Sequence, residues 1–219
     1  MKHPILHKDL EQALSFERFG RYLFWARGDR EQAIILYTLN TKASEALYTP
    51  LQMLEVALRN RINTVMTELY HKHWFNDSNI LLNSYQQEQL RKARNDLRIR
   101  KKGVTSGRIV AELMFGFWTA MLGTDYEELW QKGLHAIAKK PNGKGVARKE
   151  LSGPLTQIRI LRNRVAHHEP VINWNLLKHY RKMIEITHLL SPPAAEWCNE
   201  NSRFLEVYPT KPLMLEKGL

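Results

Sequence analysis

The sequence has little cysteine, a deficit of acidic residues and no long apolar run. Cys198 is the single cysteine among 219 residues, which excludes an internal disulfide framework and a zinc site built from several cysteines. The longest apolar stretch, residues 109–122, is shorter than the roughly 20 residues that cross a bilayer, and Glu112 interrupts it. The N-terminal segment carries acids where a signal peptide has its apolar core. We therefore expect a cytoplasmic protein with no membrane partner, and a buried helix at residues 109–122.

Acidic residues are outnumbered by basic ones, 22 against 33, which gives a net charge of +11. A surplus of this size attracts polyanions such as RNA, DNA or an anionic membrane surface, although it also aids solubility. Hydrophobic residues make up 43% and charged residues 25% of the chain, as in folded globular proteins. The length predicts one domain over residues 1–219, with a core at about 8–190 and a C-terminal helix and extended tail at 191–219.

Helical spacing of apolar residues recurs along the chain, whereas alternating strand patterns and hairpin dipeptides are scarce, and this predicts an all-α fold. The clearest helix is predicted to begin at Thr49, with Thr49 as its cap, Pro50 at its first position and Gln52 closing a capping box. Its apolar stripe consists of Leu54, Ala57, Leu58, Ile62, Val65 and Leu69. Further capping patterns predict helices that begin at Ser84, Thr124 and Asn173, the last of them ending at Leu190.

Three segments lack the helical pattern. Residues 101–107 and 139–145 are predicted loops, because they are rich in glycine, proline or asparagine. The second loop contains Gly143 and Lys144 but lacks the upstream glycine and the following Ser or Thr of a phosphate-binding P-loop, so we do not predict a nucleotide site there. Residues 203–219 hold two prolines and are predicted to form an extended tail that lies on the body or on a partner.

The segment most suited to chemistry is a helix predicted at residues 153–168, whose core stripe is Ile158, Leu161 and Val165. Pro170 disfavours helical backbone at the residue before it, so the helix is expected to end at about His168. At 100° per residue, His167 points about 180° away from Ile158, and Asn163 lies about 40° from His167. That outer face is therefore polar and free to act.

Arg162 lies about 140° from His167 around an ideal helix, so the two meet only through the reach of the arginine or across a partner subunit. A histidine that titrates near neutrality suits proton transfer, and the planar guanidinium suits a phosphate. These are the two functions needed when the 2′-hydroxyl of RNA attacks its own phosphodiester. The alternative is a helix-end pair that caps carbonyls and contacts acids.

The stretch L-R-N-R-V-A-H-H-E-P-V at residues 161–171 resembles the Arg-x4-His core of HEPN ribonucleases, and in particular their Abi-like (abortive infection) branch. Two further stretches, L-E-V-A-L-R-N-R-I at 54–62 and E-L-M-F-G-F-W at 112–118, support the resemblance, which spans roughly residues 46–171. Members of the family pair as dimers that bring two Arg/His motifs into one cleft, and many cut RNA as toxins or phage-defence effectors. The resemblance implies a HEPN-like helical bundle with additional helices, RNA as substrate, a homodimer and no cofactor.

The resemblance also implies residue roles: His167 as general acid/base, Arg162 as phosphate clamp and Asn163 as a polar positioner. The supporting residues would be Glu55, Arg59, Asn60 and His168. Glu55 and Arg59, however, are also spaced for an ordinary i,i+4 ion pair. HEPN toxins controlled by a nucleotidyltransferase antitoxin carry a tyrosine two residues after the histidine. Here that position is Glu169, so the sequence gives no sign of that control, and another antitoxin protein remains a candidate partner.

The densest basic run is a second candidate site, for RNA phosphates. It consists of Arg91, Lys92, Arg94, Arg98, Arg100, Lys101 and Lys102. The alternative is an ordinary solvated helix face. No metal site is predicted, because the histidines at 71, 73 and 168 lack a second ligand cluster with suitable spacing. Two functions follow: a metal-independent endoribonuclease that leaves a 2′,3′-cyclic phosphate, or a helical dimer that holds RNA or a protein without cutting it.

Overall fold

The computed structural model describes residues 12–81, 83–209, 213 and 215, and in these residues it is all-α, as predicted, with one isolated bridge between Lys139 and Gly145. The first half of the chain forms α2 (Phe16–Trp25), α3 (Arg30–Leu69), η1 (Trp74–Asn76), α4 (Ser84–Ile99), α5 (Ser106–Glu112) and α6 (Phe115–Ala120). The second half forms η2 (Thr124–Tyr126), α7 (Glu127–Lys132), η3 (Leu134–Ile137), α8 (Arg148–Ala166), α9 (Leu176–Leu190), α10 (Pro192–Asn201) and α11 (Phe204–Val207). None of the helices in the described residues has the length and apolarity needed to cross a membrane.

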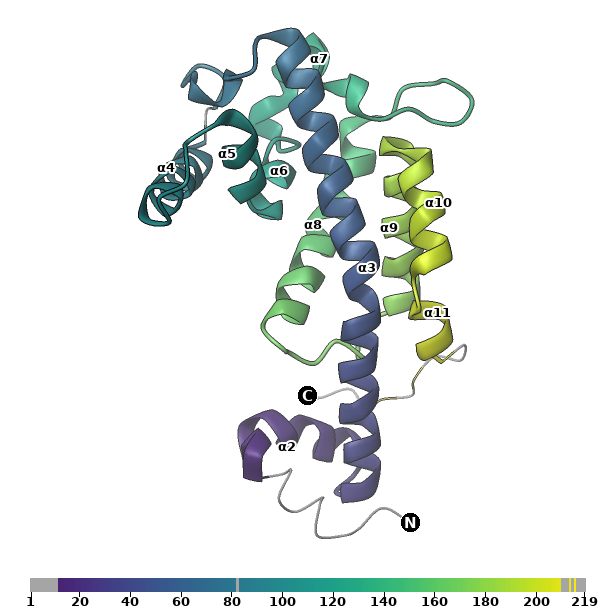
Figure 1. The fold of residues 1–219 in the computed structure, drawn as a ribbon. Helices are drawn as coiled ribbons and strands as arrows, with labels where there is room; N and C mark the ends of the chain where they lie inside the picture. Colours follow the sequence, from purple (N-terminus) through teal and green to yellow (C-terminus); the bar gives the residue numbers. More distant parts are fainter. Residues whose placement is uncertain (1–11, 82, 210–212, 214, 216–219) are drawn as a thin grey trace.

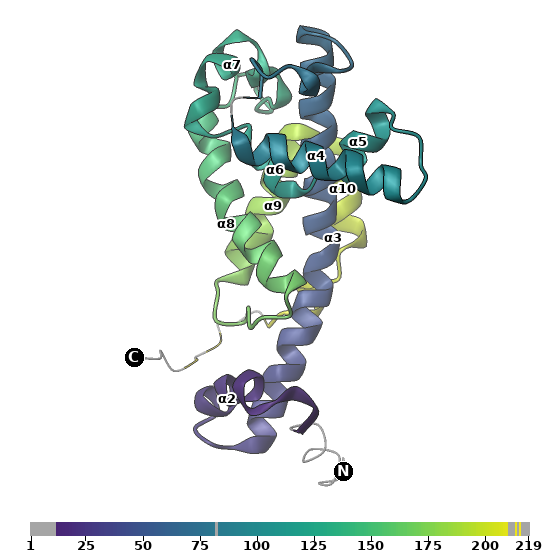
Figure 2. The same cartoon turned by 90° about the vertical axis from the view of Figure 1, so that its left-hand side faces the viewer.

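The axis of the fold is α3, a helix of 40 residues along which α8, α9 and α10 lie (Figures 1 and 2). The predicted helix start at Thr49 is wrong, because α3 begins at Arg30 and runs through Pro50. Asp29 provides the true cap, since its side chain accepts a hydrogen bond from the Gln32 N–H. A proline inside a helix costs about 3 kcal/mol or more. Buried apolar residues on both sides of Pro50 offset that cost, and the predicted stripe from Leu54 to Val65 is indeed buried.

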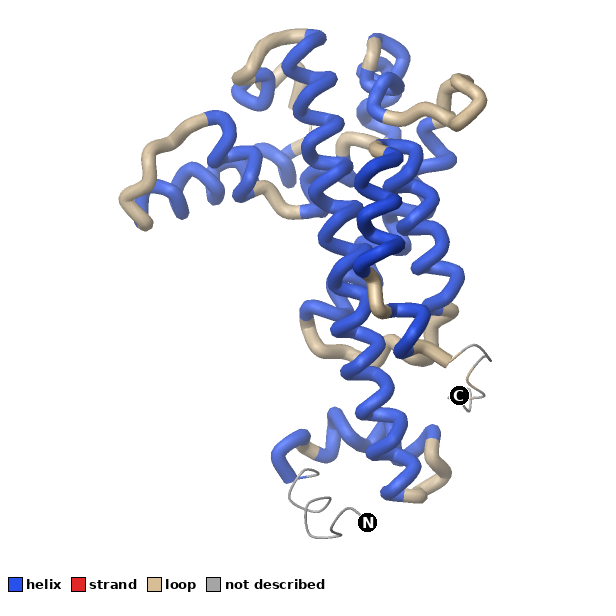
Figure 3. Tube along the Cα trace, turned by 45° about the vertical axis from the view of Figure 1, so that its right-hand side comes forward, coloured by secondary structure: helices blue, strands red, loops and turns tan. Residues whose placement is uncertain are grey.

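Two hydrophobic cores lie along α3. The larger one fills the bundle and includes the clustered rings of Trp74, Phe117 and Trp118. The smaller one joins α2 to the N-terminal half of α3, where Phe19, Tyr22 and other apolar residues pack with Ile172 from the loop after α8. This end of α3 projects beyond the other helices of the bundle, and α2 packs against it (Figures 1 and 3).

Several other predicted boundaries shift by a short distance. The start of α4 at Ser84 is as predicted, although Asn83 is its cap. Asn175 rather than Asn173 caps α9. The side chains of Asn83 and Asn175 each accept a hydrogen bond from a free N–H group in the first turn of their helix. The predicted end of α9 at Leu190 is confirmed. At Thr124 the chain forms the 3₁₀ turn η2 before α7.

Two predictions need larger corrections. Residues 109–122 do not form one buried helix, because the extended backbone of Leu113 and Met114 separates α5 from α6. Residues 203–219 are not wholly extended, since α11 is helical and its Phe204 is buried and stacks on Tyr180. Residues 210–212, 214 and 216–219 of the predicted tail, and residues 8–11 of the predicted core, lie outside the described residues.

The C-terminal segment belongs to the bundle, because α10 and α11 both pack against α3. Cys198 of α10 is fully buried, and burial raises the pKa of its thiol to about 11. A thiol with such a pKa stays protonated at neutral pH and is a poor nucleophile. Cys198 therefore serves packing and not chemistry.

Candidate functional site

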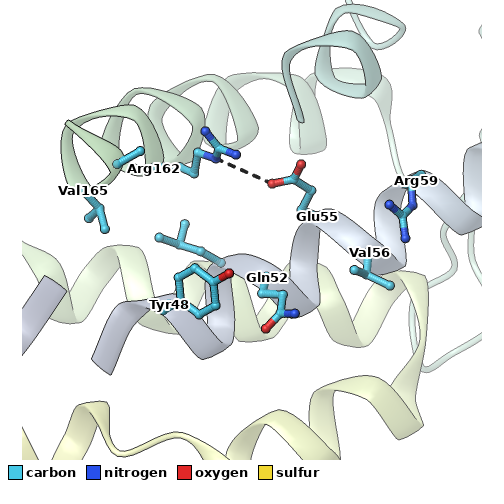
Figure 4. A pocket seen from close by; sticks show the side chains of 9 residues that line it. Tyr48, Gln52, Glu55, Val56, Arg59, Arg162 and Val165 are labelled. Carbon is cyan, nitrogen blue, oxygen red and sulfur yellow. Dashed lines mark ion pairs between the residues drawn. The ribbon is translucent and has the colours of Figure 1, made fainter. Parts of the chain in front are cut away.

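A pocket of about 310 Å³ lies between the middle of α3 and the end of α8 (Figure 4). From α3 it is lined by one helical face, Tyr48, Leu51, Gln52, Glu55, Val56 and Arg59. From α8 it is lined by Arg162, Val165 and Ala166. Spacings of three and four residues place these side chains on one face of each helix. Two helices that are distant in the sequence thus build one pocket lined by both polar and apolar side chains.

The central contact of the pocket is an ion pair between Arg162 of α8 and Glu55 of α3 (Figure 4). The Arg162 Nε lies 3.6 Å from the Glu55 Oε2, and the two side chains are 35% and 21% exposed. Glu55 is therefore paired across the pocket, whereas Arg59 donates from its Nε to the amide oxygen of its neighbour Asn60. The pair contributes less than about 1 kcal/mol at such exposure. It places opposite charges from two helices at the pocket wall.

His167 lies at the exposed end of α8, which ends at Ala166, two residues before the predicted end at about His168. Its N–H donates to the Asn163 carbonyl, and the next two residues close a Schellman motif: His168 donates to Val165 and Glu169 to Arg164. His168 has a φ of 57°, a left-handed conformation that glycine adopts more easily. The helix end is therefore sharply defined, and both histidine rings are exposed.

Arg164 fastens the loop that follows this helix end. Its Nη2 donates to the Pro170 carbonyl at 2.9 Å and pairs with Glu169 at 3.4 Å, while its guanidinium lies over the Trp174 ring. Its Nε is buried and makes no hydrogen bond within the described residues. Sequence reasoning missed Arg164, although it stands inside the motif. Its contacts with Glu169, Pro170 and Trp174 within the chain indicate a structural role.

Asn40 of α3 fastens the same loop from the other side. It is only 4% exposed, and its Oδ1 accepts hydrogen bonds from the backbone N–H groups of Val171 at 2.7 Å and Ile172 at 3.3 Å. Sequence reasoning missed this residue too. The signal was available, because Asn40 is a polar residue placed between the apolar positions Leu36 and Ala43 of one helix face.

Not all of the predicted catalytic and supporting residues come together in one chain. Glu55, Arg59 and Arg162 line the pocket, whereas the exposed Asn163, His167 and His168 do not. Asn60 is also exposed and contacts Arg59. A single chain therefore presents the arginine and the histidine of the motif on adjoining surfaces and not in one cavity.

The basic run lies on α4 and the loop after it, beside α5 and α6 and away from the end of α8 (Figure 2). Three of its seven members are engaged within the chain: Arg91 with Glu88, Arg94 with Asn76 and Arg100 with Glu112. The exposed members outside these contacts are Lys92, Arg98, Lys101 and Lys102. The surface that this run offers to a polyanion is therefore smaller than the sequence indicated.

A family model described as "Abi-like protein" matches residues 13–173, a segment that contains α2 to α8 and every residue of the pocket. No curated protein and no solved structure matches the chain. The described residues contain no group of three or more His, Cys, Asp or Glu side chains arranged to hold a metal ion.

Proposed function

The chain belongs to the Abi-like protein family, and from this premise we propose that it is a metal-independent endoribonuclease of the HEPN type, acting as a toxin or phage-defence effector. The observation that carries the proposal is the position of Arg162. This first residue of the R-x4-H motif pairs with Glu55 at the wall of a pocket, and the motif histidine lies at the end of the same helix. Family membership alone is consistent with abortive infection, and the chemistry rests on these side chains.

The reaction needs two groups. The imidazole of His167 takes the proton of a ribose 2′-hydroxyl, whose oxygen then bonds to the adjacent phosphorus. The 5′-oxygen of the next nucleotide leaves and receives a proton from an imidazolium. Arg162 binds the non-bridging oxygens, where negative charge builds up in the transition state. The products are a 2′,3′-cyclic phosphate and a free 5′-hydroxyl.

The site is complete only in a homodimer, in which the Arg162 of one subunit meets the His167 of the other. A two-fold axis near the end of α8 generates two such sites from one self-complementary surface. Exposed apolar side chains next to the motif support this, because Tyr48 is 64% exposed at the pocket and Ile160 is 38% exposed on the α8 face that carries Asn163. A dimer would cover both.

Purified protein is expected to cleave single-stranded RNA in the presence of EDTA and to leave cyclic-phosphate ends. An RNA with 2′-O-methyl riboses lacks the nucleophile and is expected to bind but to remain intact. The measurement is gel analysis of the products, with and without phosphatase and acid treatment to identify the ends. Cleavage of the methylated RNA, or cleavage that EDTA stops and Mg²⁺ restores, would contradict the mechanism.

The second candidate function is a non-catalytic dimer that binds RNA or a protein. The observation that favours it is the ion pair of Arg162, whose charge is already matched by Glu55. Such a protein leaves RNA uncut at every incubation time, with or without EDTA, and retards RNA in a gel when RNA is its ligand. The same experiment therefore separates the two functions.

The basic run is proposed as a path for RNA phosphates, and its exposed and engaged members are expected to contribute differently to RNA binding. Replacing the exposed Lys92, Arg98 and Lys101 with glutamine is expected to weaken RNA binding equally for all sequences. The salt dependence is expected to flatten by about 0.7 in log–log slope for each lost contact to a single strand. Cleavage at saturating RNA is expected to persist.

A matched control removes the same charge from the engaged arginines of this run, Arg91, Arg94 and Arg100. This triple glutamine variant is expected to change the salt slope less, because these side chains already contact Glu88, Asn76 and Glu112. Equal slopes for the parent and both variants would show that the run is a solvated face and that RNA passes elsewhere.

A further inference from the structure

A second pocket, of about 250 Å³, lies on the opposite side of α3 from the first. Its walls come from α3, from the segment that joins η3 to the loop at 139–145, and from the junction of α9 and α10. Arg61 lines it, and Arg61 lies about 200° around the helix from Arg59, which lines the first pocket. The two pockets therefore open on different faces of the bundle.

Basic side chains from three separate segments line this second pocket: Arg61 of α3, Lys139 and Lys140 of the loop, and His188 of α9. The other lining residues are apolar, and no acidic side chain is among the described residues that form the wall. A concave surface with three permanent cations and a low-dielectric floor focuses a positive potential. It therefore favours a small, multiply charged anion.

Arg61 is held in place by the backbone. Its Nε donates to the Ile137 carbonyl at 3.2 Å and its Nη2 to the Ala136 carbonyl at 2.9 Å. The guanidinium thus keeps its full charge without a carboxylate partner in these contacts, and two of its five N–H groups fix its plane. A cation fixed in this way loses little conformational entropy when it binds an anion.

The loop that carries the two lysines is also fastened. The Lys139 N–H donates to the Leu189 carbonyl of α9 at 3.1 Å, and the Lys140 N–H donates to the Lys144 carbonyl at 2.9 Å. The Lys140 ammonium pairs with Glu150 at 2.9 Å. That contact lowers the pKa of the Glu150 carboxyl. Lys139 remains exposed, so the lining keeps a surplus of positive charge beside a rigid backbone.

We propose that this pocket binds a phosphate group, at a site separate from the candidate catalytic pocket. Tetrahedral phosphate matches the donors available, because a guanidinium fork and two ammonium groups can each contact a different oxygen. The phosphate belongs either to the backbone of RNA or to a small phosphorylated molecule. The RNA case rests on the proposed function, whereas the phosphate site itself does not.

The experiment titrates the full chain with inorganic phosphate and follows the ring protons of His188 by NMR, the signal being assigned with His188→Gln. We expect a saturable shift in the parent. The double variant Lys139→Gln, Lys140→Gln is expected to bind about tenfold more weakly or worse, since hydrogen bonds to charged groups are lost.

The control is the double variant Lys144→Gln, Lys149→Gln, which removes the same charge from exposed residues of the same region that do not line the pocket. It is expected to bind phosphate like the parent. No saturable shift in the parent, or equal weakening in both double variants, would overturn the proposal. In that case the cations would only offset the carbonyl ends of η3 and α9.

A 2′-O-methyl RNA distinguishes the two sources of the phosphate without depending on cleavage. If the pocket binds the RNA backbone, the Lys139 and Lys140 variant loses affinity for this RNA and the control variant does not. If both bind the RNA equally while only the pocket variant loses inorganic phosphate, the ligand is a small phosphorylated molecule. Inactive Arg162 or His167 variants are expected to bind phosphate with the affinity of the parent. The phosphate titration therefore tests this pocket even if the ribonuclease proposal fails.

Discussion

Replacing His167 with alanine is expected to lower the single-turnover rate of RNA cleavage by about 10²- to 10⁴-fold, the range that general acid–base catalysis contributes. The unfolding midpoint is expected to stay unchanged. His167 is exposed, and the hydrogen bond that fixes it comes from its backbone N–H and not from its ring. Truncation of the ring therefore opens no core cavity.

Two histidines provide controls for this variant. His168 is the exposed neighbour in the left-handed position of the Schellman motif, and His73 is exposed near η1. Alanine at either position is expected to keep most of the turnover. A large loss of turnover in His168→Ala with none in His167→Ala would assign the acid–base role to His168. Normal turnover in both variants would show that neither histidine is the general acid–base group.

Mixing two inactive variants tests whether the site is shared between subunits. If Arg162 acts with the partner's His167, a mixed dimer of Arg162→Ala and His167→Ala subunits contains one intact site. Random exchange makes half of the dimers mixed, so about a quarter of the parent activity is expected to return. No recovery in mixtures that light scattering shows to be dimeric would place the site within one subunit. A particle of 25.7 kDa at all concentrations would exclude the dimer.

The fold class could be predicted from the sequence because helical spacing depends on local side-chain pattern, and the buried stripe from Leu54 to Val65 followed that pattern. The start of α3 could not. Thr49, Pro50 and Gln52 satisfy a local capping rule, but whether a proline starts a helix or lies inside one depends on the packing of the residues before it. Apolar residues from Ala33 to Leu47 are buried against α2 and the bundle, and that tertiary packing decided the outcome.

The candidate site also has features that the sequence predicts and features that depend on tertiary contacts. The motif spacing identified Arg162 and His167, and helix geometry placed His167 on an exposed surface as observed. The partner of Glu55 could not be predicted, because the i,i+4 pattern with Arg59 is local whereas the contact with Arg162 joins two distant helices. The position of Asn40 among apolar residues marked it as a buried polar group, but the two N–H groups that donate to its Oδ1, those of Val171 and Ile172, approach it only in the folded chain.

Replacing Asn40 with alanine is expected to have the largest effect on stability, a loss of about 2–4 kcal/mol in the free energy of unfolding. The change leaves the N–H groups of Val171 and Ile172 without their acceptor, and each unsatisfied buried donor costs about 1–3 kcal/mol. Both residues are buried, so water does not readily replace the amide. The bond to Val171, at 2.7 Å, accounts for more of the loss than the longer one to Ile172.

The measurement is urea unfolding followed by circular dichroism, with Asn60→Ala as the matched control. Asn60 lies on the same helix but is exposed, so its replacement is expected to change the free energy of unfolding by less than about 0.5 kcal/mol. Because Asn40 fixes the loop next to His167, Asn40→Ala is also expected to slow cleavage under conditions where the variant remains folded. Equal stability of the two variants would show that Asn40 does not anchor the loop. Slower cleavage by Asn40→Ala, together with an unchanged cleavage rate in Asn60→Ala, is the expected result. It would link the N-terminal half of α3 to the proposed chemistry at the end of α8.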